Sequence, residues 1–103
     1  MSRWLDAARV ADFETGRPVV LELEDTDVAV FVLDGQYYAI QDICTHDGET
    51  LTGGDVEGEE IECPRHGARF NIRTGKVTAP PAYEDLKTFP IRVHEDMVQV
   101  LVD

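Results

Sequence analysis

The chain has 103 residues, 9 Lys plus Arg against 21 Asp plus Glu, 43% hydrophobic residues and a formal net charge of -12. This length predicts one small soluble domain over residues 1–103 and leaves no room for a large catalytic fold. The negative charge excludes a nucleic-acid partner bound through its phosphates, because that requires an excess of Lys and Arg.

Nothing in the sequence suggests a membrane partner or export. Three charged residues interrupt the first ten positions, so no apolar segment typical of a signal peptide is present. The longest apolar run, Val28–Leu33, has six residues, against the roughly 20 that a transmembrane helix needs. Two cysteines are too few for a disulfide-rich secreted domain. We therefore expect a cytoplasmic protein.

The first half of the chain is typical of β structure, with no apolar 3.6-residue period over ten residues or more. Residues 2–13 are expected to form a short strand and a helical turn. Val19–Glu24 is the next predicted strand. Val28–Leu33 and Tyr37–Ile40 flank Asp34-Gly35, a dipeptide favoured in two-residue hairpin turns. These features predict an all-β fold.

The second half continues the same pattern. Short strands are predicted at Glu60–Cys63, Arg69–Ile72 and Lys76–Thr78, the last after a turn at Thr74-Gly75. The segment Ala79-Pro80-Pro81-Ala82 is expected to be an ordered loop, since proline cannot donate ladder hydrogen bonds. A closing hairpin is predicted from Phe89–Val93 and Val98–Val102 around Glu95-Asp96, with Pro90 at an edge or bulge.

The stretch from Asp42 to Gly58 is glycine-rich and the least strand-like, and a long irregular loop in so small a domain is usually functional. Cys44-Thr45-His46 opens this stretch, and Cys63-Pro64-Arg65-His66 follows it after sixteen intervening residues. One Cys/His pair in each of two loops indicates a metal site held by four side chains. The third histidine, His94, has no such neighbour, and we assign it no metal role.

The order of these ligands favours two metals over one. Structural zinc sites usually pair cysteine with cysteine and histidine with histidine, whereas this chain mixes them in each segment. Residues i and i+2 of an extended segment lie about 6.5 Å apart, an awkward spacing for one tetrahedral ion. A zinc-stabilised Cys2His2 binding module remains an open alternative.

With these four positions the chain resembles the Rieske-type 2Fe-2S ferredoxins, whose motif is C-x-H followed by C-x2-H. Further matching positions are Gly48, Gly67, Phe70-Asn71, Thr74-Gly75-Lys76 and Pro80-Pro81. The resemblance extends from about residue 3 to 102. It implies an antiparallel β-sandwich carrying a small two-loop cluster-binding subdomain, approximately residues 42–81, and one 2Fe-2S cluster per chain.

The resemblance also implies how the ligands divide. Cys44 and Cys63 are expected to hold the inner iron, and His46 and His66 the outer iron nearer solvent. Neutral imidazoles in place of two thiolates raise the reduction potential, to roughly -150 to +300 mV in such centres. The oxidised cluster with these ligands is neutral, so one added electron leaves a single negative charge.

The chain departs from the high-potential members of the family at four positions. Those members have a disulfide between the two cluster loops and Ser and Tyr hydroxyls near the cluster, where this chain has Glu49, Arg65, Ala68 and Phe70. Without those hydroxyl donors, the resemblance implies a potential in the lower part of the Rieske range. Glu49 and Arg65 either form an ion pair between the loops or each point to solvent.

The function implied is that of a soluble one-electron carrier, itself not an enzyme. It accepts electrons from a flavin-containing, NAD(P)H-dependent reductase and passes them to a terminal non-haem iron, ring-hydroxylating oxygenase. We expect a monomer, since such contacts are brief. Between Pro18 and Pro64 the chain has thirteen acidic residues and no Lys or Arg, which indicates either an acidic docking face or a solvated surface.

Two related functions stay open, namely an accessory protein of iron-sulfur cluster assembly and the small subunit of a nitrite reductase. The sequence cannot separate them, because the partner is encoded elsewhere. The aromatic residues are expected to pack into the fold rather than to conduct electrons. They include Trp4, Tyr37, Tyr38, Tyr83 and Phe89.

Overall fold

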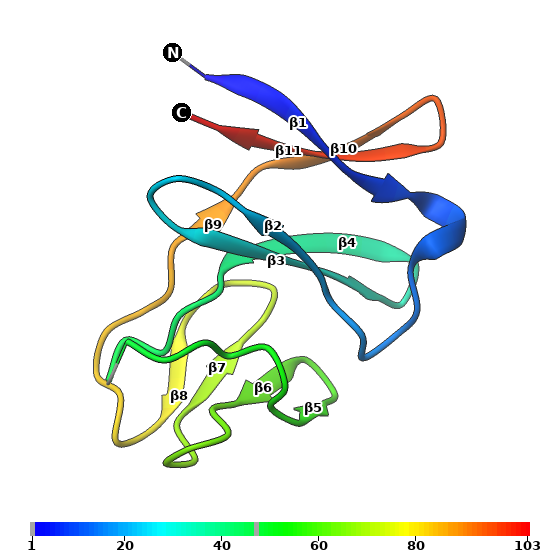
Figure 1. Ribbon diagram of the computed structural model, residues 1–103. Coiled ribbons are helices and arrows are strands. Elements are labelled where there is room, and N and C mark those ends of the chain that lie inside the picture. Colours follow the sequence, from blue (N-terminus) through cyan, green and yellow to red (C-terminus); the bar gives the residue numbers. More distant parts are fainter. Residues whose placement is uncertain (1, 47) are drawn as a thin grey trace.

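The strands of the computed structural model, which describes residues 2–46 and 48–103, form three antiparallel sheets (Figure 1). The upper sheet has the order β1-β11-β10, the middle sheet β2-β3-β4-β9 and the lower sheet β5-β6-β7-β8. The only helical element among the described residues is a 3-10 turn, η1, and no helix is long and apolar enough to cross a membrane. The all-β prediction is confirmed.

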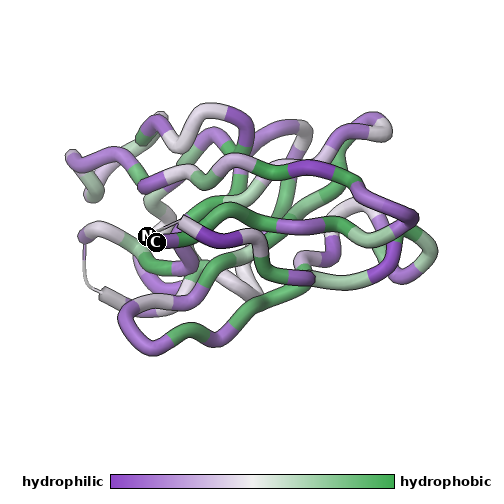
Figure 2. Tube along the Cα trace, turned by 90° about the horizontal axis from the view of Figure 1, so that it is seen from above, coloured by the Kyte–Doolittle hydropathy of each residue, from purple (hydrophilic) through white to green (hydrophobic). Residues whose placement is uncertain are grey.

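The elements are β1 (Arg3–Arg9), η1 (Val10–Asp12), β2 (Val19–Glu22), β3 (Asp27–Leu33), β4 (Gln36–Gln41), β5 (Val56–Glu57), β6 (Glu60–Glu62), β7 (Arg69–Asn71), β8 (Val77–Ala79), β9 (Thr88–Phe89), β10 (Ile91–His94) and β11 (Met97–Val102). The predicted opening strand and helical turn correspond to β1 and η1. In Figure 2, hydrophobic and hydrophilic residues alternate along much of the chain, as expected where one face of a strand is packed and the other is solvated.

Strand β3 lies between two hydrophobic cores, which explains its unbroken apolar run. Val28 and Val30 pack in one core with Val98 and Val100 of the upper sheet. Phe31 and its alternate neighbours on β3 contribute to the other core, which also holds residues of the lower sheet. Because side chains alternate between the faces of a strand, burial on both faces requires apolar residues at consecutive positions. The fold therefore has three layers: the upper and middle sheets form the predicted antiparallel sandwich, and the lower sheet packs on the other face of the middle sheet.

The two predicted hairpin turns are present and share a backbone geometry. Asp34 and Gly35 have φ of 50° and 76°, and Glu95 and Asp96 have φ of 51° and 65°. Both central residues of such a turn require positive φ, which glycine and aspartate tolerate better than glutamate. The turns set the register of the β3–β4 and β10–β11 pairs.

The predicted strand Phe89–Val93 is two strands, because Pro90 separates them. Phe89, in β9, pairs with Ala39 of the middle sheet, whereas Ile91, in β10, pairs with Val100 of the upper sheet. Both strands are at sheet edges, as expected for a residue that cannot donate a ladder hydrogen bond. Pro90 thus marks the point where the chain passes from one sheet to the other.

The lower sheet differs from the prediction at its edges. The glycine-rich stretch contains strand β5, so its irregular part ends before Val56, and β8 begins at Val77 and includes Ala79. Gly54 lies against β6, where a side chain would overlap the carbonyl oxygen of Glu62. This close backbone approach explains the glycine at that position.

Candidate metal centre

Two loops at the lower end of the molecule carry the four predicted ligands (Figure 1). The first follows β4 and the second joins β6 to β7. In each, the cysteine N–H donates to the carbonyl oxygen five residues later, and a glycine N–H four residues after the cysteine donates back to the cysteine carbonyl. The bonds are Cys44 N to Glu49 O (2.7 Å), Gly48 N to Cys44 O (2.8 Å), Cys63 N to Ala68 O (2.7 Å) and Gly67 N to Cys63 O (3.1 Å).

The two glycines of these turns have the same left-handed conformation. Gly48 has φ of 78° and Gly67 has φ of 79°, a region that costs an ordinary L residue roughly 1–2 kcal/mol. Each loop therefore has a turn of the same conformation. The histidine is nevertheless two residues after the cysteine in the first loop and three in the second.

Burial separates the four side chains into two classes. Cys44 and Cys63 are 0% and 1% exposed, lie in the lower hydrophobic core and are not joined in a disulfide. His46 and His66 are exposed, and their ring centroids are 5.1 Å apart with an angle of 86° between the ring planes. The structure thus brings the two imidazoles together at the surface and directs both cysteines inward.

This donor set suits a binuclear cluster. In the part of the chain that the structure describes, no three His, Cys, Asp or Glu side chains are grouped as ligands of one ion. A 2Fe-2S cluster of the Rieske type needs only two protein ligands on each iron, two thiolates on one and two imidazoles on the other. Buried thiols and surface imidazoles on adjoining loops match that division.

A buried aspartate beside the first loop is a site residue that the sequence analysis did not single out. Asp42 is 5% exposed and immediately follows β4. Its Oδ1 accepts hydrogen bonds from the N–H groups of Leu51 and Thr52, both at 2.9 Å, and its Oδ2 accepts one from the Thr52 hydroxyl at 2.6 Å. A carboxylate at the start of a glycine-rich loop was the available signal.

A third segment, the proline loop of residues 80–87 between β8 and β9, packs beside the first loop. The Thr45 hydroxyl donates a hydrogen bond of 2.7 Å to the Glu84 carbonyl oxygen. Tyr83 of this loop is 85% exposed, so the expectation that it packs into the fold is wrong. Its neighbour Ala82 fills the core position instead, and the next side chain along the loop projects outward.

The Glu49–Arg65 ion pair is present, with Arg65 Nη1 3.4 Å from Glu49 Oε1. The hypothesis that these residues connect the two loops is confirmed. Their side chains are 52% and 59% exposed, and an exposed pair contributes only about 0–1 kcal/mol. Ala68 and Phe70 are fully buried, and neither side chain has a hydroxyl group to donate to this site.

Charged pairs also connect the strands of the lower sheet. Arg69 on β7 lies 3.2–3.3 Å from carboxylate oxygens of Glu57, Glu60 and Glu62 on β5 and β6. Hydrogen bonds to Glu57 and Glu60 raise the pKa of Arg69 above its ordinary value. One guanidinium therefore bridges all three strands.

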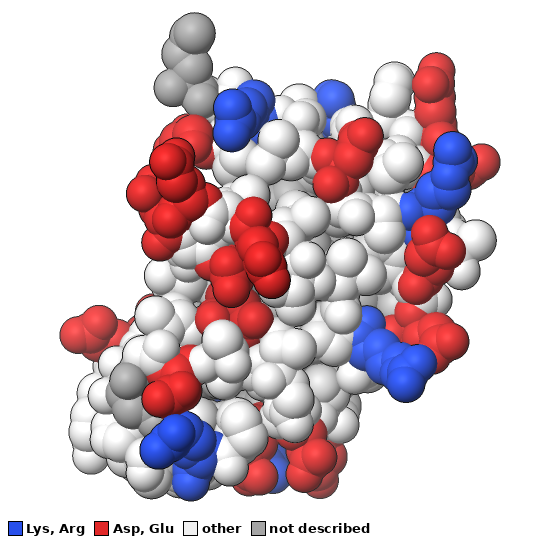
Figure 3. Space-filling view, viewed as in Figure 1, with Lys and Arg blue, Asp and Glu red and all other residues white. Residues whose placement is uncertain are grey.

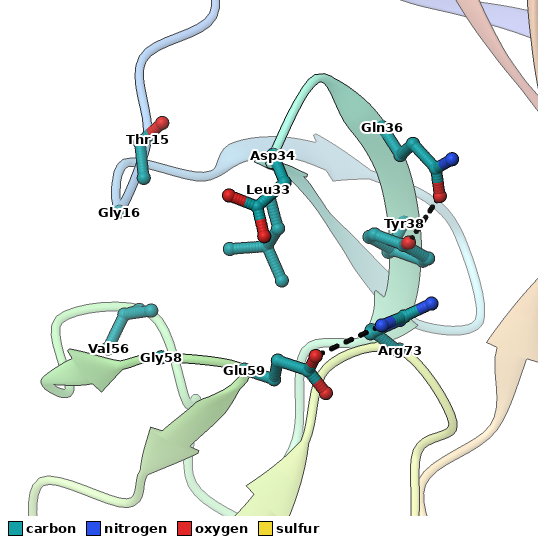
Figure 4. Close-up of a pocket in the computed structure, with 10 residues that line it drawn as sticks. All are labelled: Thr15, Gly16, Leu33, Asp34, Gln36, Tyr38, Val56, Gly58, Glu59 and Arg73. Carbon is teal, nitrogen blue, oxygen red and sulfur yellow. Dashed lines mark hydrogen bonds and ion pairs between the residues drawn. The ribbon is translucent and has the colours of Figure 1, made fainter.

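A pocket of about 610 Å³ opens between the middle and lower sheets, away from the ligands (Figure 4). Arg73 lies 5.6 Å over the Tyr38 ring and 3.0 Å from a carboxylate oxygen of Glu59, and the Tyr38 hydroxyl donates to Gln36. Four of the polar side chains that line the pocket, those of Gln36, Tyr38, Glu59 and Arg73, thus interact with one another. None of the four predicted ligands lines it.

Among the charged side chains on the face seen in Figure 3, acidic ones prevail, and several gather over the β2–β3 hairpin. This hairpin contains Glu22, Glu24, Asp25 and Asp27. The hairpin contacts the start of the first loop, where the Asp42 N–H donates to the Asp27 carbonyl oxygen at 2.8 Å.

Comparison with known proteins gives a consistent result. A model of the Rieske [2Fe-2S] domain family matches residues 3–90. The ferredoxin component of the naphthalene 1,2-dioxygenase/salicylate 5-hydroxylase systems of Ralstonia sp is 34% identical over 100 residues, covering 97% of this chain and 96% of that protein.

Solved structures agree with this match. A chain in the complex of reduced oxygenase and oxidized ferredoxin in carbazole 1,9a-dioxygenase superposes with a TM-score of 0.89 and 34% identity, covering 94% of this chain and 91% of that chain. A protein from Mycobacterium tuberculosis, described as an NADH-dependent nitrite reductase small subunit, gives 0.86 at 25% identity and covers 100% and 97%.

Proposed function

This chain belongs to the Rieske [2Fe-2S] domain family, and from that premise we propose that it carries single electrons from a flavin-containing reductase to a terminal ring-hydroxylating oxygenase. Family membership gives the chain one 2Fe-2S cluster. Its relatives in dioxygenase systems are electron-transfer components rather than the catalytic subunits.

We propose Cys44, Cys63, His46 and His66 as the four cluster ligands, within a cluster-binding subdomain of approximately residues 42–81. The observation that carries this proposal is the pairing of the exposed His46 and His66 rings at 5.1 Å above two buried cysteines. The bound cluster supplies one-electron redox chemistry, and the exposed imidazoles provide a short route for the electron to a docked partner.

Contacts with both redox partners are proposed at the surface around the two histidines. Tyr83 supplies an exposed aromatic group beside the first loop, a residue type enriched where protein partners bind. The acidic β2–β3 hairpin favours a partner with basic groups, and such contacts are brief and salt-sensitive. We further propose that the protein is a cytoplasmic monomer, consistent with two cysteines outside any disulfide.

The small-subunit function in nitrite reduction is the second candidate, supported by the full-length match to the M. tuberculosis protein. A permanent subunit usually exposes a continuous apolar interface. Among residues 2–46 and 48–103 the exposed large apolar side chains are Tyr83 beside the first loop, Val10 on η1 and Val93 on β10. This separation favours the carrier.

The experiment that tests the proposal is electron transfer between purified components. The chain is reduced photochemically without oxygen and mixed in a stopped-flow instrument with the ring-hydroxylating oxygenases of its source organism, and with the nitrite reductase large subunit as the competing acceptor. We expect rapid reoxidation by an oxygenase that slows as salt is raised. Reoxidation by the nitrite reductase subunit alone would overturn the proposal.

A further inference from the structure

We propose that Asp42 is a positioning residue of the metal centre, whose carboxylate closes the base of the first cluster loop and whose negative charge lowers the reduction potential. This inference rests on the ligand set proposed above. Its test uses the chain alone, so it can fail independently of the partner proposed for the electron.

The Asp42 side chain joins the two ends of the first loop through hydrogen bonds. Its carboxylate reaches over nine and ten residues to Leu51 and Thr52, so it closes a loop that contains Cys44 and His46. Leu51 is itself 0% exposed and packs in the core that holds both cysteines. Without the carboxylate, two backbone N–H groups at this buried position would lose their partner, which is costly in a protein interior.

Backbone hydrogen bonds hold the start of the first loop to two neighbouring segments. The Asp42 N–H donates to the Asp27 carbonyl at 2.8 Å, and the preceding Gln41 N–H donates to the Lys87 carbonyl at 2.8 Å. The backbone at the start of the loop is therefore attached to β3 and to the proline loop. The side chain then attaches the end of the loop to its start.

The buried negative charge of Asp42 bears on the reduction potential of the cluster. Asp42 is the one buried charged side chain among the described residues, and its three side-chain contacts are all hydrogen-bond donors. None of the ion pairs found in residues 2–46 and 48–103 gives it a Lys or Arg partner. A negative charge in a low-dielectric interior opposes the addition of an electron nearby. Net charge and hydrogen bonding are among the factors that set iron-sulfur potentials.

The test compares substitutions that separate charge from geometry. Asp42→Asn removes the charge but keeps an oxygen acceptor for the Leu51 and Thr52 N–H groups, so we expect a full cluster with a higher midpoint potential. Thr52→Val removes one donor from the carboxylate and leaves the charge less compensated, so we expect a lower potential. Asp42→Ala removes the hydrogen bonds as well, and its cluster content is expected to fall several-fold. Asp6→Asn removes an exposed acidic charge on β1 of the upper sheet, keeps an oxygen acceptor for Gln99, and serves as the control.

Iron and sulfide content, the EPR spectrum of the reduced protein and the midpoint potential are measured for each variant. Shifts of opposite sign for Asp42→Asn and Thr52→Val support the proposal, because a general loosening of the loop would not reverse sign between them. If Asp42→Asn fails to retain its cluster, the Thr52→Val potential decides on the charge. An unchanged or raised potential in Thr52→Val, or a full cluster with an unaltered EPR spectrum in Asp42→Ala, would overturn the proposal.

Discussion

The two cluster loops are alike at their cysteines and different at their bases. Both place a cysteine at the start of the same glycine-containing turn. The second loop is the tip of a hairpin, and the Glu62–Arg69 and Ile61–Phe70 pairs of β6 and β7 close it. The first loop leaves the end of β4 and has no such ladder beneath it.

The difference shows how a binding loop is stabilised where a sheet cannot do so. Backbone N–H groups in a buried position need acceptors, and a strand ladder supplies them for the second loop. At the base of the first loop, the carboxylate of Asp42 accepts hydrogen bonds from the N–H groups of Leu51 and Thr52. The first loop therefore depends on one side chain, whereas the second depends on several strand pairs.

Loss of a cysteine is expected to have the largest effect on cluster content and stability, and the effect should be the same for the two loops. Cys44→Ser and Cys63→Ser should each abolish the cluster and much of the stability, because cluster binding and folding are linked. Iron content, visible absorption and thermal unfolding measure this. A brown, fully folded Cys44→Ser or His66→Ala protein would refute the assignment of that residue.

The second largest effect is expected where the first loop packs closely on the β6–β7 hairpin. Gly54→Ala places a methyl group against the Glu62 carbonyl oxygen, and such overpacking typically costs about 1–3 kcal/mol. Gly16→Ala is the contrasting variant, because its added methyl group meets nothing within 4 Å but its φ of 82° strains any side chain, so its loss measures backbone strain alone. Denaturant unfolding should show the larger loss for Gly54→Ala. A Gly54→Ala protein as stable as the unmodified chain would mean that the loop moves away from the Glu62 carbonyl at no cost.

These contacts also show what the sequence could reveal. The Asp34-Gly35 turn and the Cys/His pairs are local patterns, and each predicted its element or site. Pro90 and Tyr83 were harder, because strand exchange between sheets and the outward direction of one loop side chain depend on tertiary packing. Asp42 was missed because its partners are nine and ten residues away, a distance at which no local periodicity operates.

A smaller effect is expected from the charged bridge under the second loop. Arg69→Gln removes three ion pairs to β5 and β6, so it should lower the unfolding temperature less than Gly54→Ala does. Because these groups are partly exposed, the loss should shrink as salt is raised. Arg17→Gln, which removes one exposed pair with Glu14, is the control. A salt-independent loss would indicate that packing of the Arg69 stem matters more than its charge.

The smallest effect is expected from the contact between the loops. Glu49→Gln and Arg65→Gln should each retain the cluster and change the free energy of unfolding by about 1 kcal/mol or less. A double-mutant cycle isolates the coupling of the pair. A coupling well above that value would mean that the ion pair connects the loops more strongly than its exposure indicates, in the way the disulfide connects them in the high-potential members.

The most direct test of the central claim is an anaerobic visible and EPR spectrum of the purified protein before and after dithionite, with iron, sulfide and zinc counted on the same sample. We expect a brown protein with two irons and two sulfides per chain, bleaching on reduction to a paramagnetic centre of low average g. A colourless protein holding one zinc ion would contradict the central claim and identify a zinc-stabilised binding module instead.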